Sequence, residues 1–317
     1  MRATTNLPVD STSLPAGVSW CLLVLVLPGM VTGLAAQEGG IEVFAGETLF
    51  ESGVRVSLTE INRSKRGLFR GSSEVADPLG RSLDDRRSVL GLDYGFDRRI
   101  TLTALVPYVD RVLKTSTTRQ SASGLGDLAL VGKYRLVHRE GRATAFNWSL
   151  VGGLETPTGA TNATDPSGPR LDPSVQVGKG SWNPFIATSA TYGYQLARFD
   201  ATAFYKLNTE GAQQFEDGDF FSISLSGAYR FLHFQYPGPT FGLRLGLQYR
   251  HEGRAEMSGA ALGDSGADEL LFTPALSIHP IPRMDLVLGA SIPVYQHYQG
   301  SQLGRDVGLI FALGMRF

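Results

Sequence analysis

Apolar and polar residues alternate with a period of two along most of this chain. The clearest case is 100–109 (ITLTALVPYV), in which every second residue from Ile100 to Tyr108 is apolar. The C-terminus repeats the pattern, since every second residue from Val307 to Phe317 is apolar. A helix would distribute these residues around its circumference, whereas a strand collects them on one side. The pattern therefore predicts β-strands with one apolar face.

About twelve segments of the chain carry this alternation. Most have ten residues or more, whereas soluble strands have about five or six. Short connections alternate with long ones, as periplasmic turns alternate with extracellular loops in outer-membrane barrels. We therefore predict an all-β fold: a transmembrane, antiparallel up-and-down β-barrel of about twelve strands, with both termini in the periplasm. The predicted strands lie near residues 51–61, 87–96, 99–111, 125–137, 142–155, 184–194, 198–208, 220–232, 240–251, 268–279, 284–296 and 305–317.

The N-terminal region carries an apolar run, 20–30 (WCLLVLVLPGM), which small residues follow. The run is shorter than the roughly 20 apolar residues that span a membrane. It predicts a signal peptide, 1–36, cleaved after Ala35 or the next residue, with a transmembrane anchor as the alternative. The remaining residues, 37–317, are expected to form the barrel, with 37–50 as a periplasmic N-terminal segment.

Composition adds constraints on partners and chemistry. Lys and Arg number 29 and Asp and Glu number 30, which gives no electrostatic case for nucleic acid as a partner. The one cysteine, Cys21, lies in the predicted signal peptide, so we expect neither a disulfide nor a cysteine-based zinc site in the mature chain. Aromatic residues gather near the strand ends on the apolar face, as at membrane–water interfaces. Outer-membrane lipid is therefore an expected partner, and the cell outer membrane the expected location.

The polar faces of the predicted strands carry charged side chains in mid-strand. In a membrane barrel these side chains would face a wet lumen. Their mixed signs predict a lumen without strong selectivity by charge. The same charges could instead pair across the lumen and close it, which would make the protein a structural or surface-adhesion barrel. The lumen-lining candidates are Asp93, Asp127, Lys133, Arg135, Asn147, Asp200, Lys206, Arg244, Gln248, Glu269, Asp285 and Arg316.

Short glycine-based motifs resemble a known family. Residues 124–128 (GLGDL) run into a strand at 133–136 (KYRL), and 155–159 (ETPTG) are followed by a further motif at 178–181 (GKGS). The motifs resemble those of outer-membrane channels tied to the meta-cleavage pathway of phenol degradation, over roughly residues 90–317. The resemblance implies a barrel of about twelve strands that takes up small, often aromatic or apolar, compounds. It supplies no catalytic residues.

Passive passage of small solutes is thus the expected function, with the solute itself unidentified. The C-terminal strand ends in Phe317 and resembles the signal read by the barrel-assembly machinery, an expected partner. The long connection 156–183 contains several prolines and Trp182. It should therefore be stiff, and it could form an apolar entrance.

Motifs for enzymatic chemistry are incomplete. Residues 124–126 lack the third glycine of a dinucleotide loop, and His251 has Ala255, not a second histidine, four residues later. The strongest enzyme alternative is an outer-membrane lipase, with Ser and His on the lipid side of the outer rim. His251 and His297 lie near that rim, but His297 has lumen parity and no strand supplies a matching Ser. We expect no enzyme, catalytic residue or cofactor.

Acidic residues near the outer loops are the remaining candidates for binding. They could hold a divalent cation or bridge lipopolysaccharide through one, but solvated loops are the favoured interpretation, so no metal site is predicted. These residues are Asp217, Asp219, Asp264, Asp268 and Glu269.

Overall fold

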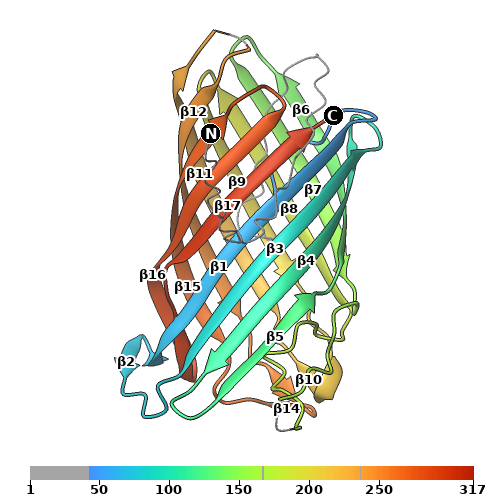
Figure 1. The fold of residues 1–317 in the computed structure, drawn as a ribbon. Coiled ribbons are helices and arrows are strands. Elements are labelled where there is room, and N and C mark those ends of the chain that lie inside the picture. The colour runs from blue at the N-terminus through green and yellow to red at the C-terminus, as the bar shows by residue number, and fades with distance from the viewer. Residues whose placement is uncertain (1–42, 166–167, 236) are drawn as a thin grey trace, which may run out of the picture. The chain divides into compact units, whose positions relative to one another are not determined.

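The computed structural model describes residues 43–165, 168–235 and 237–317. The chain divides into two compact units, Met1–Met30 and Val31–Phe317. The first unit, and with it the predicted signal peptide 1–36, lies outside the described residues. The second unit is a closed β-barrel (Figure 1). Among the described residues, no helix is both long and apolar enough to cross a membrane.

Twelve antiparallel strands form the wall of the barrel. The ring closes where the last strand pairs with the first, from Arg55 opposite Arg316 to Asn62 opposite Leu309. This confirms the predicted fold class and strand number. In chain order the strands are β1 (Val54–Gly71), β3 (Ser82–Gly95), β4 (Ile100–Lys114), β6 (Ala129–Glu140), β7 (Thr144–Glu155), β8 (Asn183–Tyr194), β9 (Ala197–Lys206), β11 (Phe220–His233), β12 (Thr240–Glu252), β15 (Ala267–His279), β16 (Met284–Arg305) and β17 (Gly308–Arg316).

The two ends of the barrel differ in their connections. Short turns and the C-terminus lie at one end, here called the inner end, and long loops lie at the other, the outer end (Figure 1). The loops carry short elements of their own. These are β2 (Ser73–Val75), β5 (Arg119–Leu125), a 3₁₀ turn η1 (Ala212–Gln214), and a small sheet of β10 (Phe215–Glu216), β13 (Glu256–Met257) and β14 (Ala260–Ala261).

The alternation of apolar and polar residues in the sequence gives the barrel an apolar outer face and a polar inner face. On β12, Leu243, Leu245 and Leu247 are 46–48% exposed, whereas Arg244 between them is 6% exposed. An apolar outer face is stable only against lipid, while the polar groups of the inner face satisfy one another within the barrel. The predicted parity of these strands is therefore the observed one.

Some strands extend beyond their predicted bounds at the outer end. β1 continues to Gly71 rather than residue 61, and β3 begins at Ser82 rather than 87, with Asn62 to Arg66 paired opposite Arg86 to Ser82. These extensions are rich in charge (NRSKR and SLDDR). Beyond the lipid both faces of a strand meet water, so the period-two pattern that revealed the strands is lost there.

β16 departs most from its prediction, 284–296. The chain reverses at Gly300, whose φ of +70° is readily adopted by glycine, and residues 301–305 return alongside β1. Earlier in β16, Leu270 of β15 pairs with Tyr295 and Leu271 with Pro293, so one residue is extra. Such a bulge reverses which face the following side chains occupy.

The N-terminal segment 43–50 corrects one prediction. We expected 37–50 in the periplasm, but the backbone of Phe44 to Glu47 contacts inward-facing side chains of the wall, whereas Phe50 is exposed. Phe44 and Ala45 are buried, and Phe44 packs in an apolar cluster with Phe204, Phe185 and other inward-facing residues. Burial of Phe44 among these rings gives a physical reason for the segment to leave water.

Candidate functional site

Segment 43–50 is held inside the barrel by hydroxyl groups of the wall. Thr202 donates to the carbonyl of Phe44 (2.8 Å) and Thr191 accepts from the N–H of Gly46 (2.9 Å). Ser149 donates to the carbonyl of Gly46 (2.6 Å). These side chains satisfy backbone groups that no strand pairs, which a buried segment requires. The segment therefore reaches from the inner end to mid-barrel without being part of the wall.

Glycine is required at position 46 of this segment. A Cβ there would lie 2.6 Å from the carbonyl oxygen of Asn147 and 2.8 Å from the backbone nitrogen of Thr191. Both are backbone atoms of the wall, so neither can move aside cheaply. Gly46 thus lets the segment run directly against β7 and β8.

Ion pairs anchor the same segment. Arg198 holds Glu47 through two hydrogen bonds (2.7 and 2.8 Å) and also contacts Asp200 (2.8 Å). Lys133 donates to the carbonyl of Ala45 (2.9 Å). Two-pronged arginine–carboxylate contacts are stronger and more directional than single ones. Arg198 was not among the predicted lining residues, although it lies on the same face of its strand as Asp200. Glu47 was not predicted because it was assigned to the periplasm.

A second group of charges lies inside the barrel near its seam. Arg55 of β1 contacts Asp285 of β16 (3.1 Å) and Asp93 of β3 (3.4 Å). Arg55 was not among the predicted lining residues, although it shares the inner face with Ser57 and Thr59. The contact between β1 and β16 spans the strand between them, so charges of opposite sign do pair within the lumen.

The predicted lining residues are dispersed over several contacts. Arg135 donates to Asn147 (3.4 Å), Lys206 to Glu155 (3.2 Å), and Arg244 lies 4.0 Å from Asp200. Those that border cavities inside the barrel are Asp93, Lys133 and Arg316 beside segment 43–50, Arg244 near the inner turns, Asp200 and Gln248 at mid-barrel, and Asp127 and Lys206 toward the outer end.

Asp127 binds backbone groups of the long loop. Its carboxylate accepts hydrogen bonds from the backbone N–H groups of Gly159 (2.9 Å) and Lys179 (2.7 Å). Gly159 and Gly178 pack so closely that a Cβ on Gly178 would lie 2.3 Å from the carbonyl oxygen of Gly159. The three glycine-based motifs, far apart in sequence, thus meet at one point and fix the long loop.

The long loop 156–182 folds over the outer mouth of the barrel. Its Leu171, Val175 and Val177 are buried against Val109 and Ala122 of β4 and β5. Arg111 of β4 donates to the carbonyl of Gln176 (2.6 Å), and Lys179 pairs with Asp217 (2.5 Å). Trp182 is exposed. The loop is therefore docked on the strands by apolar packing as well as by charge.

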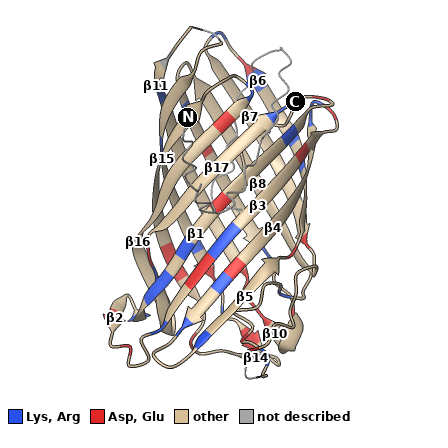
Figure 2. Cartoon of the chain, in the orientation of Figure 1, with Lys and Arg blue, Asp and Glu red and all other residues tan. Residues whose placement is uncertain are grey.

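Beneath this loop lies a cavity of about 300 Å³, here called the outer vestibule. Figure 2 shows basic and acidic residues running across the outer halves of β1, β3 and β4, the strands that form one side of it. The acidic residues of its lining are Asp85, Asp217 and Glu252. The basic residues of its lining are Arg63, Lys65, Arg87, Arg111, Lys179, Lys206, Arg250 and Arg305.

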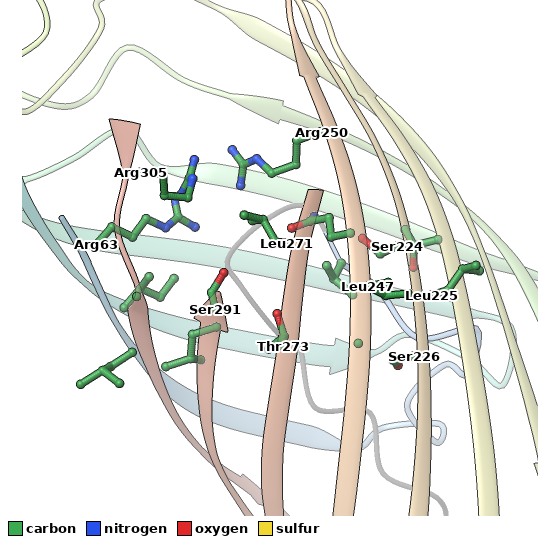
Figure 3. Close-up of a pocket in the computed structure, with 18 of the residues that line it drawn as sticks. Arg63, Ser224, Leu225, Ser226, Leu247, Arg250, Leu271, Thr273, Ser291 and Arg305 are labelled. Atoms are coloured by element: carbon green, nitrogen blue, oxygen red, sulfur yellow. The ribbon is translucent and has the colours of Figure 1, made fainter. Parts of the chain in front are cut away.

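An inner cavity lies deeper in the barrel and reaches Val43 of the N-terminal segment. Its wall carries hydroxyl groups, among them those of Ser224, Thr273 and Ser291. Figure 3 shows Arg63, Arg250 and Arg305 close together at one end of this cavity. Because the same three arginines also line the outer vestibule, they stand at the junction between the two spaces.

Residues 85–294 match the family described as "Putative MetA-pathway of phenol degradation", well over half of the 317-residue chain. The chain belongs to this family. The match includes the docked loop and its glycine-based motifs but excludes segment 43–50 and β17.

A solved structure shows the same fold. An outer membrane channel from Pseudomonas putida F1 superposes with a TM-score of 0.69 at 16% identity, covering 90% of this chain and all of the other. The β domain of a Bordetella autotransporter covers 84% of this chain with a TM-score of 0.46 at 10% identity. No curated protein matches the sequence. This member of the phenol-degradation family is an outer-membrane barrel.

His297, at the outer rim, faces outward and not toward the lumen as its place in the alternation predicted. The bulge in β16 turns His297 outward, and Ser72, in the turn after β1, places its hydroxyl 3.2 Å from His297 Nδ1. This contact was not predicted, because the alternation of apolar and polar residues does not show where a bulge lies. Asp268, opposite His297 in register, hydrogen-bonds His251 (2.8 Å) and Tyr249 (2.6 Å) instead. The Ser–His contact is therefore not extended into a triad by that carboxylate.

Proposed function

We propose that this protein is a channel for the passive passage of small solutes across the outer membrane, aromatic or apolar compounds among them, and that it has no enzymatic activity. One observation carries the proposal: the interior holds several spaces with polar groups in their walls, namely the outer vestibule, the inner cavity and spaces on either side of segment 43–50. A barrel that served only as an anchor would gain nothing from such spaces.

The comparisons support the same proposal. The family description refers to phenol degradation, and the matching Pseudomonas structure is described as an outer membrane channel. An outer-membrane protein that takes up an aromatic nutrient would supply substrate to a degradation pathway. The solute of this chain is not fixed by that likeness.

A structural or adhesion barrel is the second candidate, because segment 43–50 occupies the inner half of the lumen and is tied there by Arg198 and Lys133. The two functions differ in conductance. Refolded protein in a planar bilayer should show discrete current steps if it is a channel, and liposomes containing it should swell in small solutes. If neither the wild type nor a variant with Glu47→Gln and Thr191→Val gave current or swelling, the closed barrel would be favoured.

A further inference from the structure

Four neighbouring strands, β1, β3, β4 and β5, extend past the apolar rows of the barrel at its outer end (Figure 1). Leu90 and Tyr108 are exposed on the outside of these strands, as side chains in contact with lipid are. Beyond them the ladder continues until Arg66 lies opposite Ser82 and Ser82 opposite Lys114. The outward-facing side chains of this extension, here called the extended wall, belong to residues 60–66, 82–88, 110–114 and 119–123.

The inward neighbours of these residues establish which side chains face outward. Lys65 and Arg111 line the outer vestibule. Successive side chains of a strand point to opposite faces, so Arg66 and Lys114 face outward. Asp84 of β3 contacts both of them (3.8 Å and 3.3 Å), which places it on the same face.

The polarity of the extended wall changes in the same order on separate strands. On β1, exposed Leu58 is followed by three outward polar residues and then by Arg66. On β5, exposed Leu125 is followed by two outward serines and then by Arg119. Apolar, then polar, then cationic side chains match a lipid in which acyl chains, sugars and acidic groups follow one another. A soluble anion would use only the last of these.

The outermost row of the extended wall is cationic. Arg66, Ser82, Lys114 and Arg119 follow one another in register across the four strands. The side chains of Arg66 and Lys114 are 63% and 44% exposed, whereas that of Asp84 beside them is 23% exposed. The donors of this row are therefore accessible from outside, while the acid they share is largely covered by the wall.

The other charges of the extended wall have both signs. Arg86 lies opposite Asp110 in register. Acidic residues at the edges are Glu60, Glu74 and Asp77, the last of which is paired with Arg81. What the extended wall offers is therefore a row of exposed donors and not a high net charge.

The height of this row above the lipid-facing residues selects the kind of lipid. Lys114 follows Tyr108 on the same strand, about 20 Å farther along it. At the tilt usual for such barrels this is about 15 Å along the membrane normal. Phospholipid head groups add only about 5–8 Å to each leaflet. A lipid whose head group contains several sugars reaches the row, whereas a phospholipid does not.

We propose that the extended wall binds lipopolysaccharide of the outer leaflet through the acidic groups of its sugar core. The acyl chains contact Leu90 and Tyr108, and phosphate or carboxylate groups of the core accept hydrogen bonds from Arg66, Lys114 and Arg119. The contact is direct and needs no divalent cation, unlike the bridging considered for the acidic outer loops. It goes beyond the passage of solutes and does not depend on it.

The test compares two lipids on the full mature barrel in detergent, by surface plasmon resonance with EDTA present. Lipopolysaccharide with a phosphorylated inner core should bind roughly tenfold more tightly than lipid A, which lacks the core, and high salt should weaken the difference. Equal affinities of the two lipids would overturn the proposal. So would binding that requires Mg²⁺, or displacement of the lipid by millimolar inorganic phosphate, which would indicate a site for free anions.

A triple variant removes the row itself. Arg66→Gln, Lys114→Gln and Arg119→Gln together should weaken the core-bearing lipid about fivefold for each charge removed. The affinity for lipid A should stay that of the wild type, because lipid A does not reach the row. Heat-modifiable migration on gels checks that the variant folds.

The matched control removes the same number of charges at the inner end. Arg139→Gln, Arg142→Gln and Arg283→Gln lie in or beside short turns there, so this variant should bind both lipids as the wild type does. Equal losses in the two triple variants would show that only the overall charge of the protein matters. Unchanged binding of the core-bearing lipid by the first variant would show that the row does not contact it. Either result would overturn the proposal.

Discussion

The side-chain amide of Gln296 bridges the backbone of Arg305 beyond the last pair of residues that joins β16 to β17. Its Nε2 donates to the Arg305 carbonyl (3.0 Å) and its Oε1 accepts from the Arg305 N–H (2.7 Å). The rungs between β16 and β17 run from Met284 opposite Met315 to Ser291 opposite Gly308. Beyond them, Gln296 supplies to this backbone two of the hydrogen bonds that a neighbouring strand would supply.

Replacing this amide should destabilise the barrel. Gln296→Leu removes those two bonds, while the Tyr298 hydroxyl still accepts from the Arg305 N–H (2.9 Å), so the expected cost is about 0.5–1.5 kcal/mol. Denaturant unfolding in lipid vesicles would measure the change. Gln120→Leu is the control, because Gln120 lies on β5, outside the closed ring of strands. If both variants lose the same stability, the bridging role of Gln296 is wrong.

A charge on the outer face should lower the free energy of unfolding more than shortening a leucine there does. Leu245 is exposed toward lipid on β12. Leu245→Arg should lower the free energy of unfolding by about 2–4 kcal/mol if the site lies at the bilayer midplane. Leu245→Ala removes apolar area without adding charge and should cost clearly less. Similar losses for the two variants would mean that this face does not contact lipid.

Loosening segment 43–50 should increase conductance. Arg198→Gln removes both bonds to Glu47, and the segment should leave the lumen more often, because only Lys133, the hydroxyl groups of the wall and the packing of Phe44 then remain to hold it. Single-channel recording should show larger or more frequent openings than in wild type. Arg283→Gln, in a short turn at the inner end, serves as control. Unaltered openings in Arg198→Gln would show that the segment does not limit the current.

The docking of the outer loop should persist over a wide pH range. Burial raises the pKa of Asp217, but the attraction of Lys179 outweighs it and leaves the pKa below its usual value. Burial lowers the pKa of Lys179, but Asp217 and Glu155 together raise it above its usual value. The pair thus stabilises the loop above the ordinary carboxyl pKa and below the ordinary lysine pKa.

The sign of each shift fixes where this stabilisation is lost. It declines as pH falls through the lowered pKa of Asp217, below about pH 4, and as pH rises past about 10.5, through the raised pKa of Lys179. The protection of residues 168–182 against hydrogen exchange, relative to the intrinsic exchange rate at each pH, should therefore be constant between these limits and lower outside them. Asp217→Asn should exchange faster at neutral pH. A wild-type loop that loosens at neutral pH would contradict the ion pair.

The C-terminal residue should matter for assembly. Phe317 donates its N–H to the carbonyl of Val54 (2.8 Å) and accepts from the N–H of Val54 (3.3 Å), at the closure of the ring. Deleting Phe317 should lower the amount of heat-modifiable barrel in the outer membrane, since an open edge in lipid is costly. Phe317→Tyr keeps the backbone and the ring and should assemble. Normal assembly of the deletion would rule out this role.

Alternation along the chain determined the fold class, the number of strands and the faces of residues such as Leu245 and Arg244. That information is local, because each residue of a spanning strand meets either lipid or lumen, and its neighbour meets the other. The tertiary structure decided the rest. Segment 43–50 has no alternation to reveal it, since its partners Thr191 and Thr202 lie 145 and 158 residues away.

The same reason explains the site. Arg55 meets Asp285 across 230 residues, and Arg63, Arg250 and Arg305 come together from strands at both ends of the chain. His297 turned outward because one extra residue in β16 shifted the register, which no period-two pattern reports. The sequence determined that a charged lumen exists. Which charges meet depended on closing the ring, because closure brings distant strands into contact.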